Sequence, residues 1–161
     1  MFEGIPAGMQ AFMTELRERN DKPWYEAHKP EHRRLVKEPF GALALELGET
    51  ARSIDARILI DPRRCVSRPR RDTRFTKDKS LYRNNVWIGF KPAVDRWDLP
   101  LLYFEVMPDH FRYGLAFLDT SPAFMRKLRD YIADCPNDFR AAVREAQAAG
   151  LTVSAQCYKK P

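Results

Sequence analysis

The residues best suited to chemistry lie in one basic stretch, residues 68–85, which reads RPRRDTRFTKDKSLYRNN. It carries seven cationic and two acidic side chains in eighteen residues. The window 61–85 has a net charge of +6, which equals the formal net charge of the whole chain. Two aspartates cannot neutralise seven cations, so their repulsion must be tolerated or relieved by an outside anion. The stretch therefore predicts binding of a phosphate-bearing or other anionic ligand.

The side chains of this stretch have the chemistry that an oxyanion needs. Arginine presents a planar fork of donors, lysine presents a mobile point charge, and threonine or serine hydroxyls fill the remaining lone pairs. Arg68 belongs to the expected contact set. The other candidate ligand-binding residues are Arg70, Arg71, Asp72, Thr73, Arg74, Thr76, Lys77, Asp78, Lys79, Tyr82 and Arg83.

The alternation of residue types makes a local prediction. If residues 70–75 are extended, Arg70, Asp72 and Arg74 share one face and Phe75 lies on the other. We therefore predict that Asp72 pairs with Arg70 or Arg74. We also predict that Phe75 is buried, because the opposite face of the segment is polar.

Three functions are compatible with the motif. The first is a binding module for a small anion or nucleic acid, in which Phe75, Tyr82, Trp24 and Tyr25 are available for base stacking. The second is an enzyme acting on a small anionic substrate, with Asp72 or Asp78 as acid or base, although no nucleophile or metal site is evident. The third is structural bracing by Arg–Asp pairs alone.

Several other kinds of site are not indicated. The seven glycines are scattered and form no phosphate-binding loop, and no pair of cysteines has the spacing of a zinc site. We interpret His28 and His32 as surface or capping residues because Pro30 separates them. His110 lies in a predicted turn beside Asp109. We therefore predict no metal and no cofactor.

Length and composition favour one domain spanning residues 1–161. The chain has 161 residues and a hydrophobic content of 44%, which suffices for one core. Cys65, Cys135 and Cys157 are odd in number and far apart, which is typical of a reducing compartment. No leader and no apolar run of membrane-spanning length is apparent. We expect a cytoplasmic protein that does not enter membranes; the sequence does not indicate its oligomeric state.

Periodicity predicts the order of the elements. Helical spacing covers residues 7–20, resumes at Pro30 with a bend at Pro39, and returns at residues 121–134 and 136–150. In the predicted helix at residues 121–134, Ser121 can cap the N-terminus, and one face of the helix is expected to point toward the core. The residues of that face are Phe124, Leu128, Tyr131 and Ile132.

Alternation and turn residues predict the strands, which cover residues 57–61, 85–91, 101–107, 111–118 and 151–161. The strands at 101–107 and 111–118 should form a hairpin through Pro108–His110, and 85–91 should lie beside 101–107. The fold class is therefore α+β, with a largely antiparallel sheet packed with N-terminal and C-terminal helices. Since the last strand has no partner after it, we expect the native chain to continue beyond Pro161.

Several stretches of the chain resemble the conserved hypothetical family known as domain of unknown function 2461. They are the run RRDTRFTKDKSLYRNN, the preceding ILIDPRRCVSR and the N-terminal FMTELRERNDKPWYEAHKPEHRRLV. FRYGLAFLDTSPAFMRKLRDYI and SAQCYKKP extend the resemblance over nearly the whole chain. Leu81 stands where the family usually has proline, and Arg83 where it usually has lysine. The resemblance implies a chain that continues some tens of residues past Pro161, and it implies no activity.

Overall fold

The computed structural model describes residues 1–74, 76–93, 99–117 and 121–152. The chain divides into two compact units, Met1–Leu118 and Asp119–Pro161, and each is described here by itself. The helices and strands confirm the α+β class with an antiparallel sheet. The single domain spanning residues 1–161 stays a prediction.

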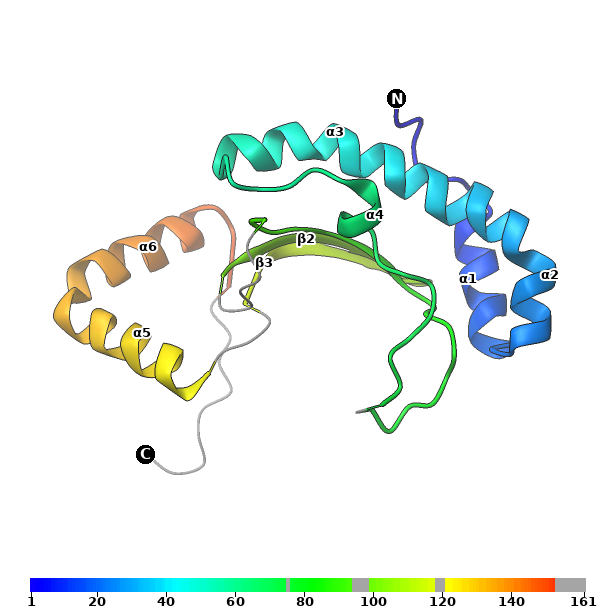
Figure 1. Cartoon of the computed structure of the whole chain (residues 1–161). Coiled ribbons are helices and arrows are strands. Elements are labelled where there is room, and N and C mark those ends of the chain that lie inside the picture. The colour runs from blue at the N-terminus through cyan, green and yellow to red at the C-terminus, as the bar shows by residue number, and fades with distance from the viewer. Residues whose placement is uncertain (75, 94–98, 118–120, 153–161) are drawn as a thin grey trace. The chain divides into compact units, whose positions relative to one another are not determined.

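The first unit begins with helices (Figure 1). On α1, the buried residues Met9, Phe12, Met13 and Leu16 recur at helical spacing, as predicted. This face packs into the core. The helical elements are α1 (Met9–Glu18), α2 (Lys22–His32), the π-helix η1 (Arg33–Lys37) and α3 (Glu38–Ile54).

The second helix does not begin at Pro30, as the sequence had indicated. It begins at Lys22, because the Asp21 carboxylate accepts a hydrogen bond from the backbone N–H of Trp24 at 2.8 Å. Pro23 follows in the first turn, where its missing N–H does no harm. Pro30 lies inside α2 instead. Pro39 stands in the first turn of α3, directly after the wide turn of η1.

The sheet has three antiparallel strands in the order β1-β2-β3. They are β1 (Val86–Phe90), β2 (Leu101–Val106) and β3 (Phe111–Ala116). The register pairs Ile88 with Phe104, and Phe104 with Tyr113. This confirms both the predicted hairpin and the position of β1 beside β2.

The predicted strand at residues 57–61 is wrong. Ile58 forms only an isolated bridge with Pro92. The Asp61 carboxylate then accepts a hydrogen bond from the backbone N–H of Arg63 and starts the short helix α4 (Pro62–Cys65). An aspartate followed by proline is a helix start, and it stops the extended chain here.

The core lies between the N-terminal helices and the sheet. Phe40, Leu43 and Ala44 of α3 are buried, and the Phe40 ring stacks on Phe104 at 6.2 Å between centroids. Gly48 of α3 lets the connection to α4 approach closely, because a Cβ there would lie 2.5 Å from Cγ2 of Ile60. The path of the chain into α4 therefore depends on a glycine at this position.

The second unit contains α5 (Pro122–Asp134) and α6 (Pro136–Ala148). The Ser121 hydroxyl accepts a hydrogen bond from the N–H of Phe124 at 3.2 Å, which confirms the predicted cap. No residue of either helix is buried, so the predicted inward face of α5 is not formed within this unit; its residues are Phe124, Leu128, Tyr131 and Ile132. Most of the predicted last strand, residues 153–161, lies outside the described residues.

Within the part of the chain that the structure describes, no helix combines the length and the apolar character needed to cross a bilayer.

Candidate anion-binding site

The basic stretch folds back on itself as a long loop whose two arms pair (Figure 1). Isolated bridges join Val66 to Ile88 and Arg70 to Tyr82. Between them, the N–H of Ser67 donates to the carbonyl of Trp87 at 2.9 Å, and the N–H of Arg83 donates to the carbonyl of Pro69 at 2.8 Å. The first arm thus extends the sheet edge at β1, and the second arm leads into β1.

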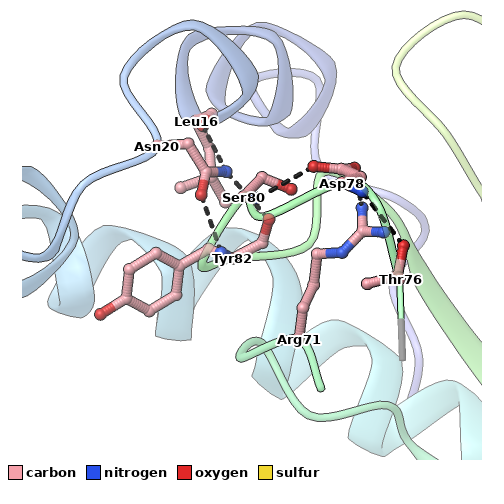
Figure 2. A network of polar contacts seen from close by, with 7 residues as sticks. All are labelled: Leu16, Asn20, Arg71, Thr76, Asp78, Ser80 and Tyr82. Carbon is pink, nitrogen blue, oxygen red and sulfur yellow. Dashed lines mark hydrogen bonds and ion pairs between the residues drawn. The ribbon is translucent and has the colours of Figure 1, made fainter. Parts of the chain in front are cut away.

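Asn20 fixes this loop to the N-terminal helices (Figure 2). Its Oδ1 accepts from the N–H of Tyr82 at 2.8 Å, and its Nδ2 donates to the carbonyl of Tyr82 at 2.9 Å. The same Nδ2 donates to the carbonyl of Leu16 at 3.1 Å. One amide side chain therefore satisfies both backbone groups of Tyr82 and ties them to the end of α1.

The aromatic residues proposed for base stacking are mostly part of the core. Tyr82 is 7% exposed, and its ring stacks on Tyr25 at 3.9 Å between centroids. Trp24 and Tyr25 are buried as well. These three rings are therefore not presented to a ligand at the surface. Phe75 lies outside the described residues.

Both aspartates of the motif pair with arginines inside the loop. Asp72 Oδ2 lies 2.7 Å from Nη2 of Arg74, which confirms the predicted pair. Asp78 Oδ2 lies 2.7 Å from Nη1 of Arg71 (Figure 2). Lys79 donates to the carbonyl of Thr73 at 2.8 Å and closes the tip further. The contacts of Asp78 and Lys79 join the two arms of the loop to each other, and all three contacts stabilise its folded shape.

The hydroxyls of the loop form turns. Thr76 Oγ1 accepts from the N–H of Asp78 at 3.2 Å, and Asp78 Oδ1 accepts from the N–H of Ser80 at 2.9 Å. Hydrogen bonds from Arg74 lower the pKa of Asp72 to about 2. Hydrogen bonds from Ser80 and the charge of Arg71 lower the pKa of Asp78. Both carboxylates are ionised and weakly basic near pH 7, which suits an ion pair better than proton transfer.

A cavity of about 270 Å³ lies beside this loop. Its wall is mostly apolar, with Met13, Val36, Val66 and Val86 among the residues that line it. No aspartate or glutamate lines it in the described part of the chain. The residues that contribute charge or hydrogen bonds are His32, Lys37, Arg63, Ser67, Arg68, Arg83 and Asn85.

The structure separates the sequence-predicted residues into two groups. Of the motif, Arg68 and Arg83 line the cavity. The other candidates lie along the loop and do not line it; Arg70, Lys77 and Lys79 are exposed there. Sequence reasoning missed Lys37 and Arg63, which come from η1 and α4. Arg63 and Arg64 lie inside the basic window 61–85, so a signal for them was present in the sequence. No sequence pattern near Lys37 connects it to that window.

Arg83 is the most unusual of the lining residues. Its guanidinium carbon lies 4.4 Å from the centroid of the Trp87 ring. Its Nε is buried and has no hydrogen-bond partner among the described residues. Burial and the nearby Arg71 lower the pKa of Arg83, while Glu105 and Asp72 act in the opposite direction. A buried charged donor without a partner is destabilising, so Arg83 lowers the stability of the fold at this position.

Glu105 is a buried carboxylate near Arg83, and both of its oxygens accept hydrogen bonds from other side chains. Its Oε1 accepts from Nδ2 of Asn85 at 2.5 Å, and its Oε2 accepts from Nε of Arg112 at 2.6 Å. The charge of Glu105 supports the ionised state of Arg83. The cavity therefore keeps its positive character.

His32 is not the surface or capping residue that the sequence suggested. Its ring packs against Phe12 and Tyr25, and its Nδ1 lies 3.5 Å from the Tyr25 hydroxyl. Burial, followed by the charge of Lys37, lowers the pKa of His32 to about 4. The imidazole is neutral at pH 7, so it lines the cavity as a hydrogen-bonding group without charge.

The other two histidines have local roles. His28 stacks on Trp24 at 4.1 Å between centroids, and its Nδ1 lies 2.8 Å from the Trp24 carbonyl oxygen. Nδ1 of His110 lies 2.8 Å from Oδ1 of Asp109, as expected for residues of the turn. Neither residue lines the cavity.

Comparison with known proteins places the chain in a family without an assigned activity. The model of the conserved hypothetical protein family DUF2461 matches residues 9–161. A search of curated proteins and a search of solved structures each returned no significant match.

Proposed function

We propose that this chain, which belongs to the DUF2461 family of conserved hypothetical proteins, binds a phosphate-bearing or other anionic ligand in the cavity beside Arg68 and Arg83. The observation that supports this most strongly is the charge of the lining. Lys37, Arg63, Arg68 and Arg83 come from four separate places in the sequence and meet around one cavity. Among the described residues, no acidic side chain joins them there.

The chemistry of the lining suits an oxyanion. Arginine forks can each donate two parallel hydrogen bonds to a phosphate or carboxylate, and three arginines, Arg63, Arg68 and Arg83, line the cavity. The Ser67 hydroxyl and the neutral imidazole of His32 add uncharged groups that can hydrogen-bond. The volume of about 270 Å³ is close to the lower end of the range of ligand pockets, ~300–1,000 Å³.

The apolar part of the wall indicates an organic ligand. The side chains of Met13, Val36 and Val86 form no hydrogen bonds and are among the residues that line the cavity. A ligand that has a carbon skeleton and an anionic group would remove this surface from water while its charge meets the arginines. A nucleic acid is less well supported, because Trp24, Tyr25 and Tyr82 are buried.

The proposal does not extend to catalysis by Asp72 or Asp78. Each carboxylate is engaged by an arginine 2.7 Å away, and neither residue lines the cavity. Their lowered pKa values make them poor proton acceptors at pH 7. The ion pairs fold the loop, and the cavity carries the proposed binding.

Thermal denaturation with increasing phosphate or sulfate tests the proposal, with Arg68→Ala and Arg70→Ala as matched variants. Both arginines are exposed and lie two residues apart on the same arm, but only Arg68 lines the cavity. A bound anion raises Tm by mass action. We expect a saturable rise in wild type and in Arg70→Ala, and a weaker rise in Arg68→Ala. An equal response in the two variants would contradict the proposal.

A further inference from the structure

A second cavity adjoins the first one and is also cationic. It has a volume of about 310 Å³, and four cationic residues line it, namely Arg63, Arg64, Arg68 and Lys91. No acidic residue of the described chain lines it. Arg63, Val66, Ser67 and Arg68 line both cavities. The two spaces are therefore separated only by α4 and the start of the loop arm.

The cavities lie on opposite faces of the edge that this arm adds to the sheet. Val86 lines the first cavity and Trp87 lines the second. Successive residues of a strand point to opposite faces, so these two neighbours in β1 identify the two sides. The bridge between Val66 and Ile88 pairs one edge of the arm with β1, so the opposite edge of the arm faces away from β1. A ligand can therefore contact both faces by crossing that outer side at Ser67 and Arg68.

We infer that the ligand carries at least two linked anionic groups, as a diphosphate or triphosphate does, and that it spans both cavities across residues 66–68. This inference rests on the proposed function of the first cavity. Arg68 would contact the bridging region, since it lines both sides. Arg64 and Lys91 belong to the second cavity alone. Their positive charges would contact the second anionic group of the ligand, because a single phosphate in the first cavity would be too far from them.

Charge also favours this ligand class over a single phosphate. Six cationic residues line the two cavities together, and Arg63 also pairs with Asp61 at 3.3 Å. One phosphate has too little charge to offset this concentration of cations. Linked phosphates distribute more charge along the same path, and each arginine can bind them through paired hydrogen bonds.

The test is isothermal titration of the full chain with orthophosphate, pyrophosphate and tripolyphosphate, using wild type, Arg64→Ala and Arg52→Ala. Arg52 is exposed on α3 and lines neither cavity, so its variant controls for the loss of one positive charge. In wild type we expect pyrophosphate to bind at least about tenfold more tightly than orthophosphate. In Arg64→Ala, the affinities for the two longer anions should fall about fivefold or more, while orthophosphate affinity changes less than twofold.

The outcomes separate this inference from the proposed function. Two results would overturn the two-cavity inference and leave the first cavity as an anion site. One is equal affinity of wild type for the three anions, and the other is equal affinity of Arg64→Ala and Arg52→Ala for the two longer anions. Absence of binding by all three anions would overturn the proposed function and this inference together. Circular dichroism of each variant shows that the fold is retained, and Arg64→Gln provides a second variant if Arg64→Ala unfolds.

Discussion

The guanidinium of Arg83 lies over the indole ring of Trp87, 4.4 Å from its centroid, while its Nε is buried without a hydrogen-bond partner among the described residues. The cation–π contact holds the guanidinium against the indole ring. It does not satisfy the in-plane donor at Nε, which needs an acceptor in the same plane. The fold thus carries the cost of one buried arginine donor that no acceptor satisfies among the described residues.

This relationship predicts that binding and stability oppose each other at Arg83. Arg83→Met keeps an apolar side chain against Trp87 and removes the buried donor. We expect the free energy of unfolding to rise by about 1 kcal/mol, because the penalty of an unsatisfied buried group is about 1–3 kcal/mol and some packing is lost. Anion affinity should fall about tenfold or more. Denaturant unfolding and calorimetry measure the two quantities.

The matched control is Arg70→Met, which changes the same residue type on the exposed arm of the loop. Its effects on both quantities should be small, since substitutions at the surface usually change stability by less than about 0.5 kcal/mol. If Arg83→Met is less stable than Arg70→Met and binds anions as well as wild type does, the buried donor has no role in binding.

Asn20 is predicted to be a main anchor of the loop. Asn20→Ala leaves the N–H and the carbonyl of Tyr82 without their side-chain partner. We expect a loss of about 1–3 kcal/mol in the free energy of unfolding, as for other buried groups left unpaired. Thr14→Ala is the control, because its hydroxyl bonds only within α1. Equal stability of the two variants in urea denaturation would show that Asn20 does not anchor the loop.

Gly48 is predicted to be intolerant of a side chain. The added methyl of Gly48→Ala would lie 2.5 Å from Cγ2 of Ile60, so the chain leading to α4 must shift. Overpacking of this kind lowers stability by about 1–3 kcal/mol. Gly41→Ala is the control on the same helix, because its nearest neighbour, Cβ of Pro62, lies 3.9 Å away. Thermal denaturation should show a loss for the first variant only, and Ile60→Ala should partly rescue it.

His32 predicts a specific dependence of stability on pH. Its folded pKa of about 4 lies below the ordinary value, so the unfolded chain binds more protons between pH 4 and 6.5. This contribution to stability is therefore complete above pH 6.5 and is lost as the pH falls toward 4. Wild type should lose about 1–2 kcal/mol more than His32→Gln between pH 7 and pH 5. Parallel losses in urea denaturation of the two proteins would contradict a buried neutral imidazole.

Local patterns in the sequence predicted the elements whose signals are themselves local. The alternation of Val86, Ile88 and Phe90 predicted β1, and the turn residues before Phe111 predicted the hairpin. The pairing of Asp72 with Arg74 spans two residues, so it also followed from spacing. The start of α2 was missed although Asp21 and Pro23 signal it, because Pro30 offered a competing signal.

The site could not be predicted in the same way, because it depends on contacts between distant parts of the chain. Tyr82 looked like an available aromatic residue, but Asn20 and Tyr25, about sixty positions away, hold it in the core. The cavity brings Lys37, Arg63 and Arg83 together from three elements. Charge counting found the basic region, but it could not distinguish arginines that pair with Asp72 and Asp78 from those that line the cavity.

Anion binding in the cavity is tested most directly by the NMR signals of the arginine Nε–H groups during a titration with phosphate. Arg→Lys variants assign the signals of Arg68, Arg71, Arg74 and Arg83. We predict a saturable shift of the Arg83 and Arg68 signals, because these residues line the cavity. The signals of Arg71 and Arg74, which pair with aspartates, should change little. Saturable shifts of Arg71 and Arg74 with an unchanged Arg83 signal would contradict this prediction.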